Sequence, residues 1–225
     1  MGVKLKKRSS SFNVLSQGFT IIELLVGMAV SLLALTAIYS TFQTQHKSYL
    51  MQQEIAAMQQ NLRAAMFYMQ REIRMAGCDP LGTAGAGIIA ASDSSINFSE
   101  DVWDGSDGSA PDGDADDSNE DITYSLIGDD LKRKTGGGNY QVVAENIDAL
   151  NFVYLDTNGS ETAVLADIRS VEITIVARIS RPLRDSPNNR DYFNQRNTQI
   201  LSAQGDRYSR RRLTSFIKCR NLGLN

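Results

Sequence analysis

The first third of the chain carries one helical pattern of apolar positions that changes character partway along. Residues 19–42 are apolar on every side and contain a single charged side chain, Glu23. Gly77 followed by Pro80 is a typical signal for the end of a helix. The pattern predicts one long helix from about residue 19 to about residue 75, apolar over 19–42 and amphipathic over 43–76. In the second half, apolar residues recur at steps of three and four, at Met51, Ile55, Met58, Leu62, Met66, Met69, Ile73 and Ala76.

After Pro80 the apolar pattern takes a period of two, which is typical of strands. We predict strands at 122–126, 140–144, 147–155, 168–179 and 213–218, with a hairpin turn at 156–159. Two polar segments, an acidic one at 99–120 and an arginine-rich one at 184–212, are predicted to be loops that bury little apolar surface. The prediction is an α+β fold in which the long helix packs on an antiparallel β-sheet domain spanning residues 77–225.

The apolar half of the helix is long enough to cross a membrane, since about 24 residues span a hydrocarbon core of about 30 Å. Four basic residues and no acid precede it, so the positive-inside rule puts residues 1–18 in the cytoplasm and 43–225 outside. A cleaved secretory signal fits poorly because the run is too long and no A-x-A site ends it. An uncleaved single-pass anchor remains an alternative, but a carboxylate inside lipid costs about 2.5 kcal/mol, and Glu23 then has no partner.

Charge is strongly segregated along the chain, although the formal net charge is only −3. Residues 93–130 contain acids and no Lys or Arg, whereas residues 178–225 are rich in arginine. The two regions either pair within the fold or contact partners of opposite charge, including neighbouring copies in an assembly.

Three residue patterns suggest metal, disulfide or nucleic-acid chemistry. Asp112, Asp114 and Asp116 begin a calcium-loop pattern, but Asp117 and Thr123 stand where an EF-hand has Gly and Glu, so a solvated loop and no cofactor are favoured. The second is a pair of exported cysteines, Cys78 and Cys219, which are either bridged or reduced. The third is the basic run Arg210, Arg211 and Arg212, with Tyr208 and Phe216 nearby; an exposed edge strand or ion pairing with the acidic segment is favoured for it over nucleic-acid binding.

Enzymatic chemistry is not expected. The sequence has no nucleophile elbow, phosphate loop or paired-histidine metal motif. Its only histidine, His46, is predicted to be a surface residue of the helix.

The N-terminal junction resembles the class III signal of type IV pilins and of the pseudopilins of type II secretion. The resemblance rests on a basic leader, Gly18 before Phe19, Glu23 four residues later, and the anchor helix. It implies that prepilin peptidase cleaves between Gly18 and Phe19 and methylates the new Phe19 amine. Removal of residues 1–18 leaves 225 − 18 = 207 residues. It also implies that Glu23 meets the N-terminal amine of an adjacent subunit, while Gly27, Ala29 and Ala34 allow close helix approach.

Further stretches, at 71–80, 144–152, 168–175 and 218–222, resemble the PilW minor pilins, which are related to the GspJ pseudopilins. Ser40 stands where major pilins often have Pro, which favours a minor subunit. The resemblance implies an inner-membrane protein with a periplasmic domain that later enters the pilus. Its partners would be prepilin peptidase, other minor pilins, the major pilin and the assembly platform. A type II secretion pseudopilin, a DNA-uptake pilin and an unprocessed single-pass binding protein are the alternatives.

Overall fold

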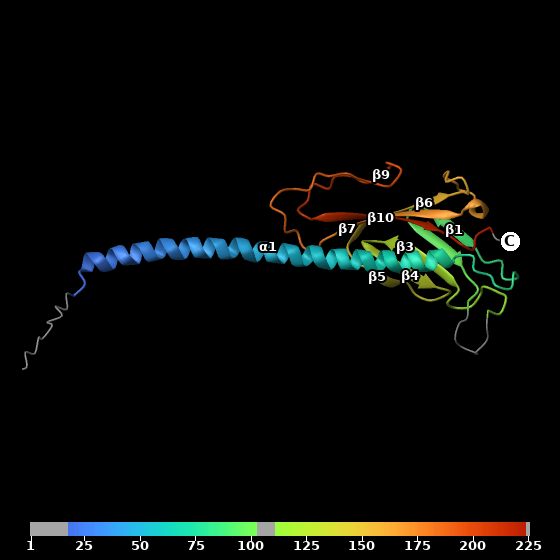
Figure 1. The fold of residues 1–225 in the computed structure, drawn as a ribbon, viewed down its shortest axis with the longest axis horizontal. Coiled ribbons are helices and arrows are strands. Elements are labelled where there is room, and N and C mark those ends of the chain that lie inside the picture. Colours follow the sequence, from blue (N-terminus) through green and yellow to red (C-terminus); the bar gives the residue numbers. More distant parts are fainter. Residues whose placement is uncertain (1–17, 103–110, 224–225) are drawn as a thin grey trace, which may run out of the picture. The chain divides into compact units, whose positions relative to one another are not determined.

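The computed structural model describes residues 18–102 and 111–223, and the chain divides into two compact units, 1–48 and 49–225. The long helix α1, Ile21–Met75, contributes to both units. Except for Gly18, the predicted leader lies outside the described residues, as does the middle of the predicted acidic loop. Figure 1 shows the order of the elements along the chain.

The described part of the first unit is the first half of α1 and the residues that precede it. Its large apolar side chains, such as Leu24, Leu33 and Phe42, are exposed because nothing in the unit covers them. Within the described ranges, α1 is the one helix long and apolar enough to cross a membrane, judged by length and composition. The predicted surface residue His46 is exposed and stacks on Phe42, with ring centroids 6.0 Å apart.

The second unit, here called the head, combines the rest of α1 with antiparallel sheets. One sheet is a five-stranded meander in the order β1 to β5, which are Ile88–Ser92, Ser95–Ser99, Asp121–Ile127, Asp130–Thr135 and Gln141–Ala144. The other has the order β10-β7-β6, with β6 at Ile147–Leu155, β7 at Ser170–Arg178 and β10 at Arg210–Lys218. A 3-10 helix, η1, covers Leu165–Asp167.

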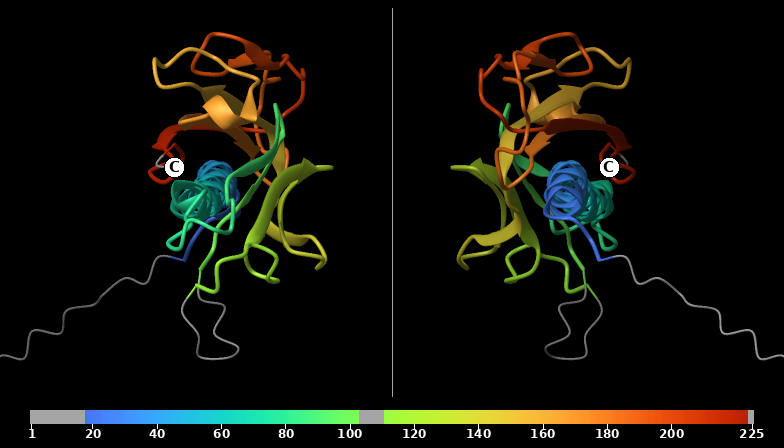
Figure 2. Two further views of the ribbon diagram at one scale, coloured as in Figure 1. Left: turned by 90° about the vertical axis from the view of Figure 1, so that its right-hand side faces the viewer. Right: turned by 90° about the vertical axis from the view of Figure 1, so that its left-hand side faces the viewer.

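The core of the head forms where the apolar stripe of α1 meets both sheets. From Met58 to Ala76 every predicted stripe position is buried, in one cluster with residues of both sheets such as Phe98 and Ile175. Met51 and Ile55 are partly buried at its margin. In Figure 2 the helix is seen end on, beside the two sheets. The methionine-rich stripe is therefore core, as the helical periodicity predicts.

The prediction that residues 184–212 bury little apolar surface is wrong. This segment forms a small hairpin from β8, Tyr192–Phe193, and β9, Gln199–Leu201. Tyr192 packs with Ala149 of β6 and Val176 of β7 in a second apolar cluster. Strand β7 is consequently buried on both faces. Thr174 and Val176 are covered on one face, and Ile173 and Ile175 are buried on the other.

The predicted acidic loop is also more ordered at its ends than a solvated loop would be. Ser99 belongs to β2, and the amide of Glu100 donates to the Glu120 carbonyl at 3.0 Å. The Asp101 amide donates to the carbonyl of Cys78, just past α1, at 2.7 Å. Glu100, Asp101 and Glu120 are buried, so the two ends of this segment are part of the head.

Candidate functional site

The helix that carries the predicted processing junction begins with a capping box. Thr20 immediately precedes α1, and its amide and hydroxyl donate to Glu23 Oε2 at 2.8 Å and 2.9 Å. The Glu23 amide donates back to the Thr20 hydroxyl at 3.3 Å. This reciprocal pattern satisfies donors that the first helical turn leaves unpaired. The Thr-x-x-Glu spacing from Thr20 to Glu23 is the sequence signal that could have predicted this box.

The capping box gives Glu23 a local role and leaves part of its carboxylate available. Oε2 accepts both bonds from Thr20, whereas Oε1 makes no hydrogen bond with any described residue. Glu23 is exposed, and Phe19 is 89% exposed one turn earlier. The carboxylate is thus held at the start of the helix with one oxygen open to a cation from another molecule.

Small residues line the same side of the apolar helix half. A hollow of about 480 Å³ is bordered by Phe19, Glu23, Gly27, Ser31 and Leu35. The Ser31 hydroxyl donates to the Gly27 carbonyl at 2.8 Å and is satisfied within the helix. A Cβ at position 27 would meet no atom within 4 Å, so the glycine leaves open space rather than fitting the chain's own fold. Such a surface suits the close approach of another helix in lipid.

Cys78 and Cys219 are free thiols in this structure. Burial raises the pKa of the Cys219 thiol to about 12. Burial also raises the pKa of Cys78, and the carboxylates of Glu100, Asp101 and Asp79 raise it further. Both thiols are therefore protonated near neutral pH, and disulfide exchange requires the thiolate.

The weak calcium pattern is not assembled into a site. The side chains of Asp112, Asp114 and Asp116 are exposed, and two of them accept hydrogen bonds from the amide two residues later. In residues 18–102 and 111–223, no three His, Cys, Asp or Glu side chains converge closely enough to hold a metal ion.

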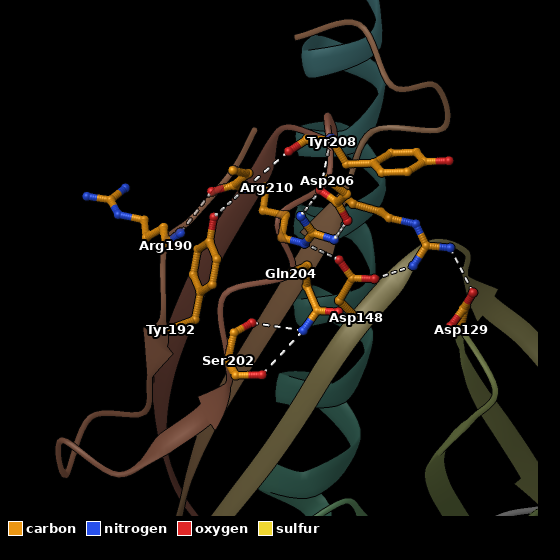
Figure 3. A network of polar contacts seen from close by, with 11 residues as sticks. Asp129, Asp148, Arg190, Tyr192, Ser202, Gln204, Asp206, Tyr208 and Arg210 are labelled. Atoms are coloured by element: carbon orange, nitrogen blue, oxygen red, sulfur yellow. Dashed lines mark hydrogen bonds and ion pairs between the residues drawn. The ribbon is translucent and has the colours of Figure 1, made fainter. Parts of the chain in front are cut away.

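The basic run in β10 is not one continuous charged patch. Arg210 is enclosed: it donates to Asp148 at 2.5 Å and, through two nitrogens, to Asp206 at 2.6 Å and 2.5 Å. Arg178 also bonds Asp148 and lies over the Tyr208 ring, with 5.5 Å to the centroid. Figure 3 shows these groups as one network. Pairing within the fold, rather than a phosphate-binding stripe, accounts for Arg210.

The end of α1 is joined to the larger sheet by a polar contact that periodicity does not reveal. The Glu72 carboxylate accepts from the Tyr124 hydroxyl of β3 at 2.6 Å and from Arg133 Nε of β4 at 2.9 Å. Burial and the hydrogen bond to Glu72 raise the pKa of the Tyr124 hydroxyl. This contact fixes the helix at the level where Gly77 turns the chain, with φ of +75°.

Comparison with known proteins gives matches for the N-terminal segment and for the fold. Residues 15–39 match the model of the prokaryotic N-terminal methylation motif. The structure is similar to a type IV-like pilin from Thermus thermophilus, with a TM-score of 0.53 and 13% sequence identity, covering 72% of this chain and 97% of that one. No curated protein matches the sequence.

The head and helix have the pilin fold, a long N-terminal helix whose second half packs on antiparallel sheet. The chain therefore shares its fold with a type IV-like pilin and carries the N-terminal methylation motif at residues 15–39. The motif implies processing by prepilin peptidase and a membrane-associated assembly.

Proposed function

We propose that the chain is a minor pilin of a type IV pilus. It enters the inner membrane once with its head in the periplasm, is cleaved between Gly18 and Phe19, and is methylated on the Phe19 amine. It then joins other minor pilins, the major pilin and the assembly platform to prime or cap the filament.

The observation that carries this proposal is the geometry of Glu23. Cleavage after Gly18 creates a charged amine on the residue before Thr20, the helix-capping residue. A carboxylate within the apolar, membrane-crossing part of the helix requires a cation as partner. The Phe19 amine is such a cation, and in an assembly it comes from another subunit. The capping box holds Oε2, and Oε1 is available for the amine. A buried charge pair that forms only on assembly fixes the register between subunits.

The processing step is tested by intact mass spectrometry of the chain produced in a host with prepilin peptidase. We expect a 207-residue product that begins at a methylated Phe19, from the arithmetic above. A chain that still begins at Met1 would contradict the proposal and favour an uncleaved anchor.

The assembly step is tested by comparing two substitutions that separate charge from capping. Glu23→Gln retains a side chain able to form a capping box but removes the charge. Thr20→Val removes the capping hydroxyl but keeps the carboxylate. We expect Glu23→Gln to be depleted at least about tenfold from sheared filaments and Thr20→Val to enter them nearly normally, because assembly needs the charge pair. Equal incorporation of Glu23→Gln and the parent chain would exclude the pair.

A pseudopilin of type II secretion would use the same processing and the same charge pair. Deletion of the gene separates the two systems: loss of surface pili with normal secretion supports the pilus assignment. Loss of exoprotein secretion with normal piliation would assign the chain to the secretion system instead.

A further inference from the structure

The head carries its opposite charges at opposite ends of the helix half that it contains. The arginine-rich segment adjoins the start of this half, where Ser180 donates to Glu54 at 2.6 Å. The acidic segment adjoins its end, where the Thr83 hydroxyl donates to the Gly113 carbonyl at 2.8 Å and Asp101 bonds Cys78. About 20 helical residues separate the two levels, which corresponds to about 30 Å.

A cavity of about 430 Å³ opens at the basic end, between α1 and the segment 184–211. Its apolar wall includes Ile55 and Met58 of the helix. The described residues that line it include no Asp or Glu and four arginines: Arg184, Arg190, Arg210 and Arg211.

Three of these four arginines keep their charge for a ligand. Arg210 is neutralised from behind by Asp148 and Asp206, as described above. In the described part of the chain, Arg184, Arg190 and Arg211 form no ion pair, and Arg184 uses only Nε, toward the Ser186 carbonyl. Figure 3 shows the Arg190 guanidinium directed away from the carboxylates of the network. The cavity therefore presents about three uncompensated positive charges beside an apolar wall, which favours an anionic ligand.

The chain itself carries a ligand of matching chemistry at the other end of the head. Asp112, Asp114 and Asp116 are exposed at alternate positions, so three carboxylates lie close together on a short surface segment. None of the three forms an ion pair with any described residue. Within a single head the arginine cavity and the segment Asp112–Asp116 cannot meet, because they lie at opposite ends of the helix half.

We propose that the arginine cavity receives the Asp112–Asp116 segment of a second copy of this chain. This contact is heterologous: each copy offers one surface and leaves the other open. Repetition of a heterologous contact produces an open row with a fixed polarity rather than a closed dimer. The inference goes beyond the proposed function, because it adds a contact between copies of this chain to the contacts with other pilins.

The test uses charge reversal in the full-length processed chain, purified in detergent with processing verified by mass. Two differently tagged copies are mixed, and their apparent Kd is measured by sedimentation. The cavity variant is Arg190→Glu with Arg211→Glu, and the segment variant is Asp112→Lys with Asp114→Lys. The combined variant carries both pairs of changes. A matched control, Arg63→Glu with Arg74→Glu, makes the same charge change at exposed positions of α1 outside the cavity.

We expect either variant to weaken self-association at least about tenfold, and the combined variant to recover it, because reversed charges attract again. Association of the parent chain should also weaken as salt rises from about 50 to about 500 mM, since screening shortens the reach of exposed charges. The control should behave as the parent does.

Other outcomes overturn the inference. Unchanged association in either variant, or no recovery in the combined one, would exclude the contact between copies. Weakening by the cavity variant but not by the segment variant would show that another anion or partner occupies the cavity. The two proposals fail independently: a mass that shows an unprocessed chain would contradict the proposed function, whereas the Kd values alone decide the contact between copies.

Discussion

The buried carboxyl of Glu100 makes the stability of the head depend on pH. Glu100 follows β2, is 9% exposed, and its Oε2 has no hydrogen-bond partner. Burial and the nearby Glu72 carboxylate raise its pKa from 4.5 to about 7, while Arg133 and Arg71 oppose this change. In the folded head the carboxyl therefore stays protonated to higher pH than in the unfolded chain. Folding is then penalised progressively as the pH rises from 4.5 to about 7.

The size of this penalty follows from the difference between the two pKa values. At 1.36 kcal/mol for each pH unit, the full difference corresponds to about 3 kcal/mol above pH 7. Partial access of water to the site reduces it, and we expect about 2 kcal/mol. Glu100→Gln has nearly the same shape and no charge, so it removes the penalty. For a head of this size, that corresponds to an increase in Tm of about 4–8 °C.

The assay is thermal unfolding of the full chain in detergent, followed by circular dichroism between about pH 4.5 and pH 8. We expect the Tm of Glu100→Gln to exceed that of the parent at pH 8 and the difference to become small toward pH 4.5, where the parent carboxyl is protonated in the folded head and already half protonated in the unfolded chain.

The matched control is the same substitution at Glu72. Glu72→Gln removes the charge that holds Tyr124 and Arg133 and also relieves part of the repulsion on Glu100. The loss of the partly buried ion pair should outweigh that relief, so the substitution should lower the Tm at pH 8, opposite in sign to Glu100→Gln. If Glu100→Gln also lowered the Tm at pH 8, or raised it equally at all pH values, the argument from burial would be refuted.

Three further predictions concern packing and covalent state. Gly77→Ala should lower stability by about 1–3 kcal/mol, because φ is +75° and the new Cβ would lie 2.5 Å from Leu222 Cδ2, as denaturant unfolding would show. Met69→Ala should cost about 2–5 kcal/mol, since this side chain is fully buried in the core; a loss below about 1 kcal/mol would contradict that packing. Dithiothreitol should leave the Tm unchanged, because Cys78 and Cys219 are free thiols, and a fall in Tm would indicate a bridge.

Local signals in the sequence predicted most of the architecture. The stripe from Met58 to Ala76 is buried as its spacing requires, and 147–155 is observed as β6. The strands β1, β2 and β4 were not predicted. Their alternation is weak: β4 reads Asp-Leu-Lys-Arg-Lys-Thr, and its place depends on pairing with β3 and β5. Such pairing is a tertiary property, because strand propensity depends strongly on neighbours.

The candidate site divides in the same way. Gly18, Phe19 and Glu23 could be selected from the sequence, because their spacing is local and a charge in an apolar run is conspicuous. The arginine cavity could not be selected. Arg184, Arg190 and Arg211 are far apart in the sequence and meet only in the folded head. Only the structure shows that Arg210 is paired with Asp148 and Asp206 while the other three arginines form no ion pair with a described residue.

The sequence by itself determined the long helix, its apolar and amphipathic halves, the N-terminal methylation motif and the antiparallel character of the domain. All of these depend on periodicity or spacing within a few tens of residues. The tertiary structure alone decided which charges are neutralised, which carboxyls are buried, and that the two cysteines are free. These properties depend on residues such as Glu72, Tyr124 and Arg133 that meet only after folding, when burial and neighbouring charges alter the energy of each group.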